Sequence, residues 1–176
     1  MMSGAPSNQQ NDQTTASVAI AWLLVFNKPF YPLYVWWVTG HGGWQTTITM
    51  ISMPAFAALP YLAKRNSLWV RAGIPVIGIV DTVLATKLFG PAGGTELFFV
   101  PCALLIAIAL YRTEWRIAVG LMAMLYIIFV GLRNRYGVPL YIWTGEELSS
   151  LLTLNSISVA SLVAFIVWRF SRAERH

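Results

Sequence analysis

Residues 68–89 read LWVRAGIPVIGIVDTVLATKLF, a stretch that is almost entirely apolar and carries one acidic residue, Asp81, near its middle. A helix needs about 20 apolar residues to cross the roughly 30 Å hydrocarbon core of a bilayer. The stretch reaches that length and therefore predicts a transmembrane helix. Because an ionised side chain at that depth costs a few kcal/mol, we expect Asp81 to face the interior of a helix bundle and to have a partner there.

Five further apolar stretches, separated by short polar breaks, accompany this one. Continuous apolar runs such as residues 103–110 differ from the alternating pattern of a membrane β-barrel strand. The sequence therefore predicts an all-α polytopic membrane protein, a bundle of six transmembrane helices over residues 16–168 with membrane lipid around it. The second stretch is the weakest of the six, because it is short and contains two prolines. The other five stretches cover residues 16–38, 46–62, 96–111, 115–132 and 148–168.

The overall composition agrees with this class. The chain has 176 residues, of which 57% are hydrophobic and 11% are charged. A typical soluble domain is about 45–50% apolar and about a quarter charged. The difference argues against an ordinary cytosolic enzyme, a disordered protein and a nucleic-acid binder, so we expect no nucleic-acid partner. A single cysteine, Cys102, excludes a disulfide within the chain.

The distribution of basic residues predicts the orientation. Eight Lys and Arg residues fall on the side of the bundle that holds both termini, and three fall on the other side. By the positive-inside rule both termini are cytoplasmic. We expect residues 1–15 to form a flexible cytoplasmic tail and residues 169–176 to begin a cytoplasmic helical extension, since no Gly or Pro stops the last helix. The eight residues are Lys64, Arg65, Arg71, Arg112, Arg116, Arg169, Arg172 and Arg175.

Lys28 is the natural partner of Asp81 by depth. It lies at a break in the first stretch, between Asn27 and Pro29. At helical spacing Asp81 also shares a small, polar face with Thr82 and its neighbours, a surface that lets another helix approach closely. Two interpretations remain open. One is a structural role, as an ion pair or as a protonated, hydrogen-bonded Asp81, and the other is a site for a ligand or an ion.

Three other groups are candidates for a site. Glu96 opens the fourth stretch at the outer boundary and is explained by helix capping and a pair with Lys87, or by ligand binding on the outer face. Trp36 and Trp37 belong to an aromatic cluster that is either an interfacial belt or the wall of an apolar ligand pocket. Asn155, in the last stretch, either packs helices together or lines a pocket and transmits a signal.

The sequence lacks the residues that haem binding and nucleophilic catalysis require. The sequence contains two histidines, His41 and His176, one in an outer turn and one at the C-terminal end. A six-helix b-type cytochrome needs paired axial ligands inside the bundle, and no nucleophile with a neighbouring histidine is evident. We therefore expect no cofactor, no metal site and no catalysis by this chain alone.

Three segments carry a resemblance to a known group. They are PFYPLYVW at residues 29–36, ELFFVPC at residues 96–102, and the Arg- and Glu-rich exit at residues 169–176. Together they resemble the six-helix membrane domain of some bacterial class III adenylate cyclases and quorum-sensing hybrid histidine kinases. The resemblance implies a homodimer in the bacterial inner membrane that senses a lipophilic signal. In that group the last helix passes the signal to a cytoplasmic catalytic domain.

The chain departs from this group in two respects. Residues 1–176 contain no cyclase or kinase domain, so we expect the implied activity to belong to residues outside this sequence or to a partner. The two b-type haems of some relatives are not implied, because the histidines are missing. The sequence thus predicts a sensor domain in which Lys28, Trp36, Trp37, Asp81, Glu96 and Asn155 bind a small ligand or transmit its signal. A small transporter or channel subunit and a structural subunit of a larger complex are the alternatives.

Overall fold

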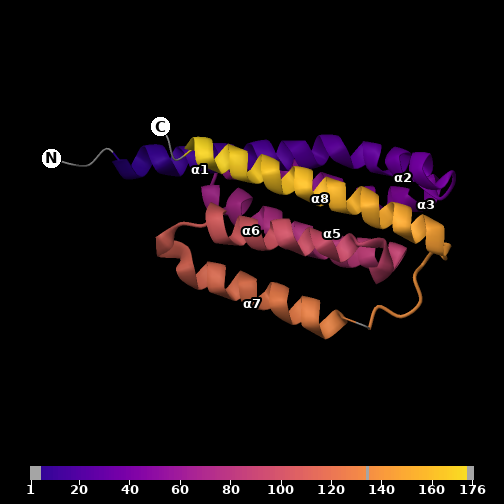
Figure 1. Cartoon of the computed structure of the whole chain (residues 1–176). Coiled ribbons are helices and arrows are strands. Elements are labelled where there is room, and N and C mark those ends of the chain that lie inside the picture. The colour runs from indigo at the N-terminus through magenta and orange to yellow at the C-terminus, as the bar shows by residue number, and fades with distance from the viewer. Residues whose placement is uncertain (1–4, 134, 174–176) are drawn as a thin grey trace.

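The computed structural model describes residues 5–133 and 135–173, and within them every regular element is a helix. The first described turn of α1 and the last of α8 lie at the same end of the bundle, called here the terminal end (Figure 1). The α-helices, in chain order, are α1 (Ala5–Asn27), α2 (Tyr31–Thr39), α3 (Gly43–Thr46), α4 (Met53–Ala63), α5 (Ser67–Phe89), α6 (Phe99–Ala109), α7 (Trp115–Leu132) and α8 (Gly145–Ala173). The 3-10 segments are η1 (Lys28–Phe30), η2 (Thr47–Ser52), η3 (Pro91–Gly93), η4 (Thr95–Phe98) and η5 (Arg112–Glu114).

In the part of the chain that is described, five helical stretches are long and apolar enough to cross a membrane. A sixth apolar helix, Thr95–Ala109, is shorter. The class of all-α membrane protein is thereby confirmed, but the prediction that residues 46–62 are the weakest stretch is wrong. The longer stretches are Asn11–Thr39, Gly43–Ala63, Ser67–Phe89, Arg112–Leu132 and Gly145–Ala173.

Prolines begin helices here more often than they interrupt them. Pro29, Pro32 and Pro54 each occupy one of the first two positions of η1, α2 and α4. The N–H that proline lacks would have no helical partner at those positions, so proline costs little there. For this reason Pro54 does not shorten the second membrane stretch, which the 3-10 segment η2 extends back to Gly43.

Helix α1 begins at Ala5, where the sequence led us to expect a flexible tail up to residue 15. Neither glycine nor proline occurs between residues 7 and 27 to stop the helix. The hydroxyls of Thr15 and Ser17 donate to the carbonyls of Asn11 and Gln13, one turn earlier. At the other end α8 continues to Ala173, as predicted for a helical extension, while residues 1–4 and 174–176 lie outside the described chain.

The helices do not contribute equally to the core. Helix α5 contacts α1, α4 and α6, and at Gly73 it approaches α4 so closely that a Cβ atom would lie 2.5 Å from Leu59 Cδ2. Helix α7 instead packs mainly on α6 and lies apart from the other helices (Figure 1). Leu125 is the one α7 residue that is buried, so most of this helix presents an apolar surface outward.

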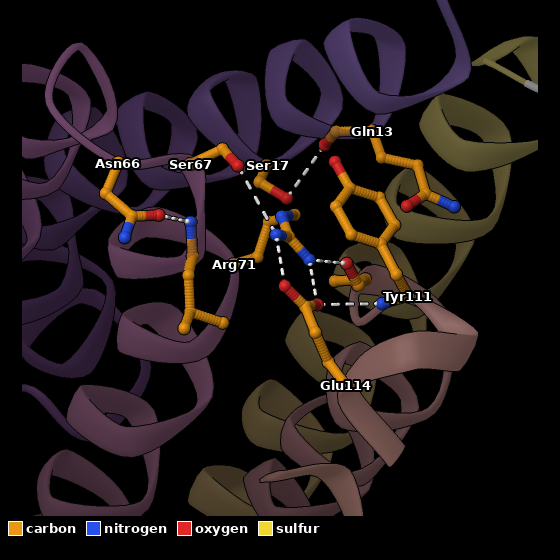
Figure 2. Close-up of polar contacts among 9 residues, drawn as sticks. Gln13, Ser17, Asn66, Ser67, Arg71, Tyr111 and Glu114 are labelled. Atoms are coloured by element: carbon orange, nitrogen blue, oxygen red, sulfur yellow. Dashed lines mark hydrogen bonds and ion pairs between the residues drawn. The ribbon is translucent and has the colours of Figure 1, made fainter. Parts of the chain in front are cut away.

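A buried arginine ties α5 to the segment between α6 and α7. Arg71 is 1% exposed and forms a bidentate ion pair with Glu114, in which Nη2 donates to Oε1 at 2.8 Å and Nη1 donates to Oε2 (Figure 2). Its Nη1 also donates to the Ala109 carbonyl at 3.2 Å. The guanidinium lies 3.6 Å from the centre of the Tyr111 ring. This paired geometry satisfies the carboxylate and fixes the α6–α7 connection at the terminal end.

Removing one partner of this pair should destabilise the bundle. Glu114→Gln leaves the Arg71 guanidinium buried without its counter-ion, and we expect the free energy of unfolding to fall by about 3 kcal/mol. The double variant Arg71→Met/Glu114→Leu should recover most of that loss, since it removes both charges. Detergent titration followed by circular dichroism measures the effect, with exposed Arg112→Met as the control. Equal stability of Glu114→Gln and wild type would contradict the assignment.

Candidate functional site

The break in the first membrane helix places Lys28 inside the bundle. Asn27 ends α1, and the chain makes one 3-10 turn that contains Pro29 before α2 begins, within the single membrane stretch Asn11–Thr39. Lys28 Nζ lies 2.5 Å from Asp81 Oδ1 and donates to the carbonyl of Thr49 at 2.7 Å. The pairing expected from the sequence is therefore present.

Asp81 receives a second hydrogen bond from a segment that sequence analysis did not single out. Ser52, at the end of η2, donates its hydroxyl to Asp81 Oδ1 at 2.7 Å. Two 3-10 segments, η1 and η2, thus meet α5 at one point. Irregular backbone at membrane depth is stable where it lines a cavity or is buried in protein. The side chains of Lys28 and Asp81 are 11% and 22% exposed, so the pair is largely enclosed.

A cavity of about 110 Å³ adjoins this pair. Its polar lining residues are Asn27, Lys28, Tyr31, Thr49, Asp81, Thr82 and Thr95. The remaining wall is apolar and comes from several helices. An engineered apolar cavity of about 150 Å³ holds a benzene molecule, so the cavity offers room for a small ligand or a few waters. The apolar lining includes Leu24, Phe56, Ile74, Phe98, Pro101, Leu105 and Leu162.

Asn155 connects this cavity to α8 and to an outer turn. Tyr31, which lines the cavity, donates its hydroxyl to Asn155 Oδ1 at 2.8 Å. Asn155 Nδ2 in turn donates to the Gly93 carbonyl at 2.7 Å. Asn155 is fully buried, and both ends of its amide are satisfied. The amide therefore bridges α2, α8 and η3.

The other predicted site residues do not join the cavity. Trp36 and Trp37 are 57% and 80% exposed and are not among its lining residues. Glu96 lies in η4 without capping that segment, and the predicted pair with Lys87 is wrong. Lys87 Nζ instead donates to backbone carbonyls of the loop between α7 and α8. The structure brings Lys28, Asp81 and, through Tyr31, Asn155 together, and leaves the three outer residues apart.

The outer loop is held by contacts that its sequence did not reveal. Lys87 Nζ donates to the carbonyls of Tyr136 and Val138 at 2.7 and 2.9 Å. Burial raises the pKa of the Tyr136 phenol, and the negative charge of Glu96 raises it further. Trp143 is buried and stacks on Phe89 at 5.6 Å between ring centres. The loop is thus attached to the end of α5 rather than free above it.

A second outer contact joins the turn after α2 to the start of α8. His41 Nε2 pairs with Glu147 Oε1, and His41 Nδ1 lies 3.1 Å from the Tyr141 hydroxyl. The imidazole also stacks on Trp143. His41 is half-exposed and lies away from the cavity lining. Within residues 5–133 and 135–173 no three His, Cys, Asp or Glu side chains are placed to hold a metal ion.

Sequence reasoning did not assign Thr49 and Cys102 to the cavity or Ser52 to the ion pair. It placed Tyr31 only in the aromatic cluster at the outer end of the first stretch. Thr49 and Ser52 act through a 3-10 segment, where helical spacing does not predict which side chains share a face. Tyr31 lies within the PFYP sequence at residues 29–32, and this pair of prolines is the available sequence signal, because prolines mark a helix break. Cys102 is buried beside the cavity, a position that the sequence did not predict.

The geometry defines a class: an all-α membrane protein with a largely enclosed ion pair beside a mostly apolar cavity. Comparison with known proteins adds no narrower identity, since no family model, no curated protein and no solved structure matches the chain significantly.

The Lys28–Asp81 pair should be energetically coupled. Lys28→Met leaves the Asp81 carboxylate without its counter-ion inside the bundle, and we expect the free energy of unfolding to fall by about 3 kcal/mol. Lys28→Met/Asp81→Leu should cost clearly less than the single change. Detergent-induced unfolding of both variants and of Asp81→Leu gives the coupling energy.

Lys87→Met is the matched control. Its ammonium bonds to carbonyls at the outer end, so adding Asp81→Leu should not rescue it. If the losses from Lys28→Met and Asp81→Leu simply add, the pair does not act as a unit.

Proposed function

We propose that this chain is a membrane sensor or receptor domain. It binds a small, lipophilic ligand in the cavity beside Lys28 and Asp81. It passes a conformational signal through α8 to a cytoplasmic output domain of the adenylate cyclase or histidine kinase type. The observation that carries the proposal is the hydrogen bond between cavity-lining Tyr31 and Asn155 of α8, because it links the cavity to the helix that would report its occupancy.

The space beside the ion pair favours a binding role over a purely structural one. In the structural pair of Arg71 and Glu114, protein donors occupy both carboxylate oxygens. Lys28 and Asp81 instead border a cavity whose wall is largely apolar. Ligand sites combine an apolar wall with a few placed polar groups in this way.

Helix α8 is suited to transmit a change. Leu162 lines the cavity and Asn155 bridges to Tyr31, so the helix touches the site at two levels. It then runs without interruption to Ala173. A ligand that fits one packing of α8 better than another shifts the population toward that packing.

The orientation and assembly follow the same proposal. Six membrane spans with both termini in the cytoplasm, in a bacterial inner membrane, agree with the common position of the α1 start and the α8 end (Figure 1). Lys64, Arg65, Arg112 and Arg172 are exposed, as the positive-inside rule requires of such a surface. A homodimer would bring the two copies of the α8 end together in the cytoplasm. The outward surface of α7 is available to a second copy or to lipid.

Filling the cavity should move α8 without any ligand. In a Cys102→Ser background, spin labels at Lys64→Cys and Arg172→Cys report the distance between the α4–α5 turn and the end of α8. Ala85→Leu places three carbons in the cavity, whose lining includes Ala85. We expect this change to shift the distance distribution by about 2 Å, the size of known helix shifts.

Two variants make this measurement specific. Asn155→Leu should abolish the shift, because it breaks the contact with Tyr31. Ala160→Leu, on an exposed position of α8, should leave the distribution unchanged. Identical distributions in wild type and Ala85→Leu would reject transmission through α8.

A small transporter or channel subunit is the second candidate. The two 3-10 segments that meet at Lys28 and Thr49 favour it, because broken helices form ion and substrate sites in transporters. Proton or solute flux into proteoliposomes tests it, and flux that Asp81→Asn abolishes would rank transport above sensing.

A further inference from the structure

We infer that the cavity takes a small uncharged alcohol or phenol, with its hydroxyl on the Lys28–Asp81 pair and its hydrocarbon part against Phe56, Phe98 and Leu105. This inference rests on the proposed binding function and narrows the chemical class of the ligand. Three properties of the cavity support it: its charge balance, its unused hydrogen-bonding groups, and its size.

The charge balance excludes an ionic ligand. The Lys28 ammonium and the Asp81 carboxylate neutralise each other across 2.5 Å. An anionic or cationic ligand would add an uncompensated charge in a site with an apolar wall, which is costly at membrane depth. An uncharged ligand leaves the pair intact.

The hydrogen bonds of the pair leave one donor and one acceptor. An ammonium has three N–H groups, and Lys28 uses two of them, on Asp81 Oδ1 and on the Thr49 carbonyl. Oδ1 of Asp81 accepts from both Lys28 and Ser52, whereas Oδ2 has no hydrogen-bond partner among the described residues. A hydroxyl accepts from the first group and donates to the second, so a single oxygen satisfies both.

Three hydroxyl groups around the cavity already donate to protein acceptors, while the exposed Asn27 lies next to Lys28 in the chain, where the cavity opens. The hydroxyl of Tyr31 donates to Asn155, that of Thr82 donates to the Gly78 carbonyl, and that of Thr95 donates to Thr86. A ligand's polar atom therefore gains most at Lys28 and Asp81. Hydrogen bonding to the ligand is therefore concentrated at the end of the cavity that holds Lys28 and Asp81.

The size of the cavity limits the hydrocarbon part. A volume of about 110 Å³ is below the roughly 150 Å³ of a benzene-binding cavity. The enclosed part therefore suits a ligand of about six non-hydrogen atoms at most, and a slightly larger one, such as a six-membered ring that bears a hydroxyl, can extend where the cavity opens. Asn27 lines the cavity and is also exposed, so it marks the side on which the cavity opens.

Cys102 provides the readout. It is the one cysteine of the chain and lines the cavity. We would measure the rate at which methyl methanethiosulfonate modifies it in lipid nanodiscs, with cyclohexanol, cyclohexane, cyclohexylammonium or cyclohexanecarboxylate present. These probes share a ring and differ in polar group and charge. The rise in Tm with each probe gives a second, independent measure of binding.

Cyclohexanol should slow the modification at least threefold and raise Tm, while both ions should have no effect. The advantage of cyclohexanol over cyclohexane should vanish in Lys28→Met/Asp81→Leu. Ala85→Leu should lose protection by every probe, and Ala160→Leu should behave as wild type.

Two results would overturn the inference. Equal effects of cyclohexanol and cyclohexane, or a stronger effect of an ion, would reject the ligand class while the cavity remains a binding site. Absence of any effect on both rate and Tm would also reject it. The spin-label distances in Ala85→Leu then decide separately whether the sensor proposal survives.

Discussion

The need to neutralise a carboxylate in the middle of a membrane helix governs the arrangement around the cavity. Asp81 lies in the interior of α5, and its counter-ion has to come from another helix at the same depth. Lys28 reaches it because the first membrane helix breaks at Pro29. The break in turn gives Lys28 the Thr49 carbonyl as a second acceptor. The turn at Pro29 and the 3-10 segment η2 therefore both contribute to neutralising the Asp81 carboxylate.

The two buried ion pairs of this chain illustrate different uses of the same chemistry. Arg71 and Glu114 meet in a bidentate geometry, with an aromatic ring against the guanidinium, and Arg71 is almost completely buried. That pair closes the terminal end of the bundle. Lys28 contacts one carboxylate oxygen of Asp81, and the two side chains border the cavity. The bidentate pair has a structural role. The Lys28–Asp81 pair leaves one N–H group and one carboxylate oxygen that another molecule can bind.

The sequence predicted the contact that depends on a residue's depth in the membrane. It did not predict the contacts that depend on the local backbone conformation. The Lys28–Asp81 pair follows from the cost of charge in hydrocarbon, which restricts the partner to a few residues. The predicted Glu96–Lys87 pair failed because Lys87 finds two carbonyls in a loop whose path no periodic pattern specifies. Ser52 was missed for a similar reason, since η2 is 3-10 rather than α-helical. The early start of α1 was missed because polar composition suggested a tail, although nothing in residues 7–15 breaks a helix.

The shortness of Thr95–Ala109 has a consequence for the surrounding lipid. At 1.5 Å per α-helical residue and 2.0 Å per 3-10 residue the helix spans about 24 Å, against about 30 Å of hydrocarbon. Hydrophobic mismatch of this kind thins the adjacent leaflet or draws headgroups inward. Phe98 and Pro101 belong both to this helix and to the cavity wall. Bilayer thickness, and with it the acyl-chain composition of the host membrane, thereby becomes a physical variable to which the helices around the cavity are exposed.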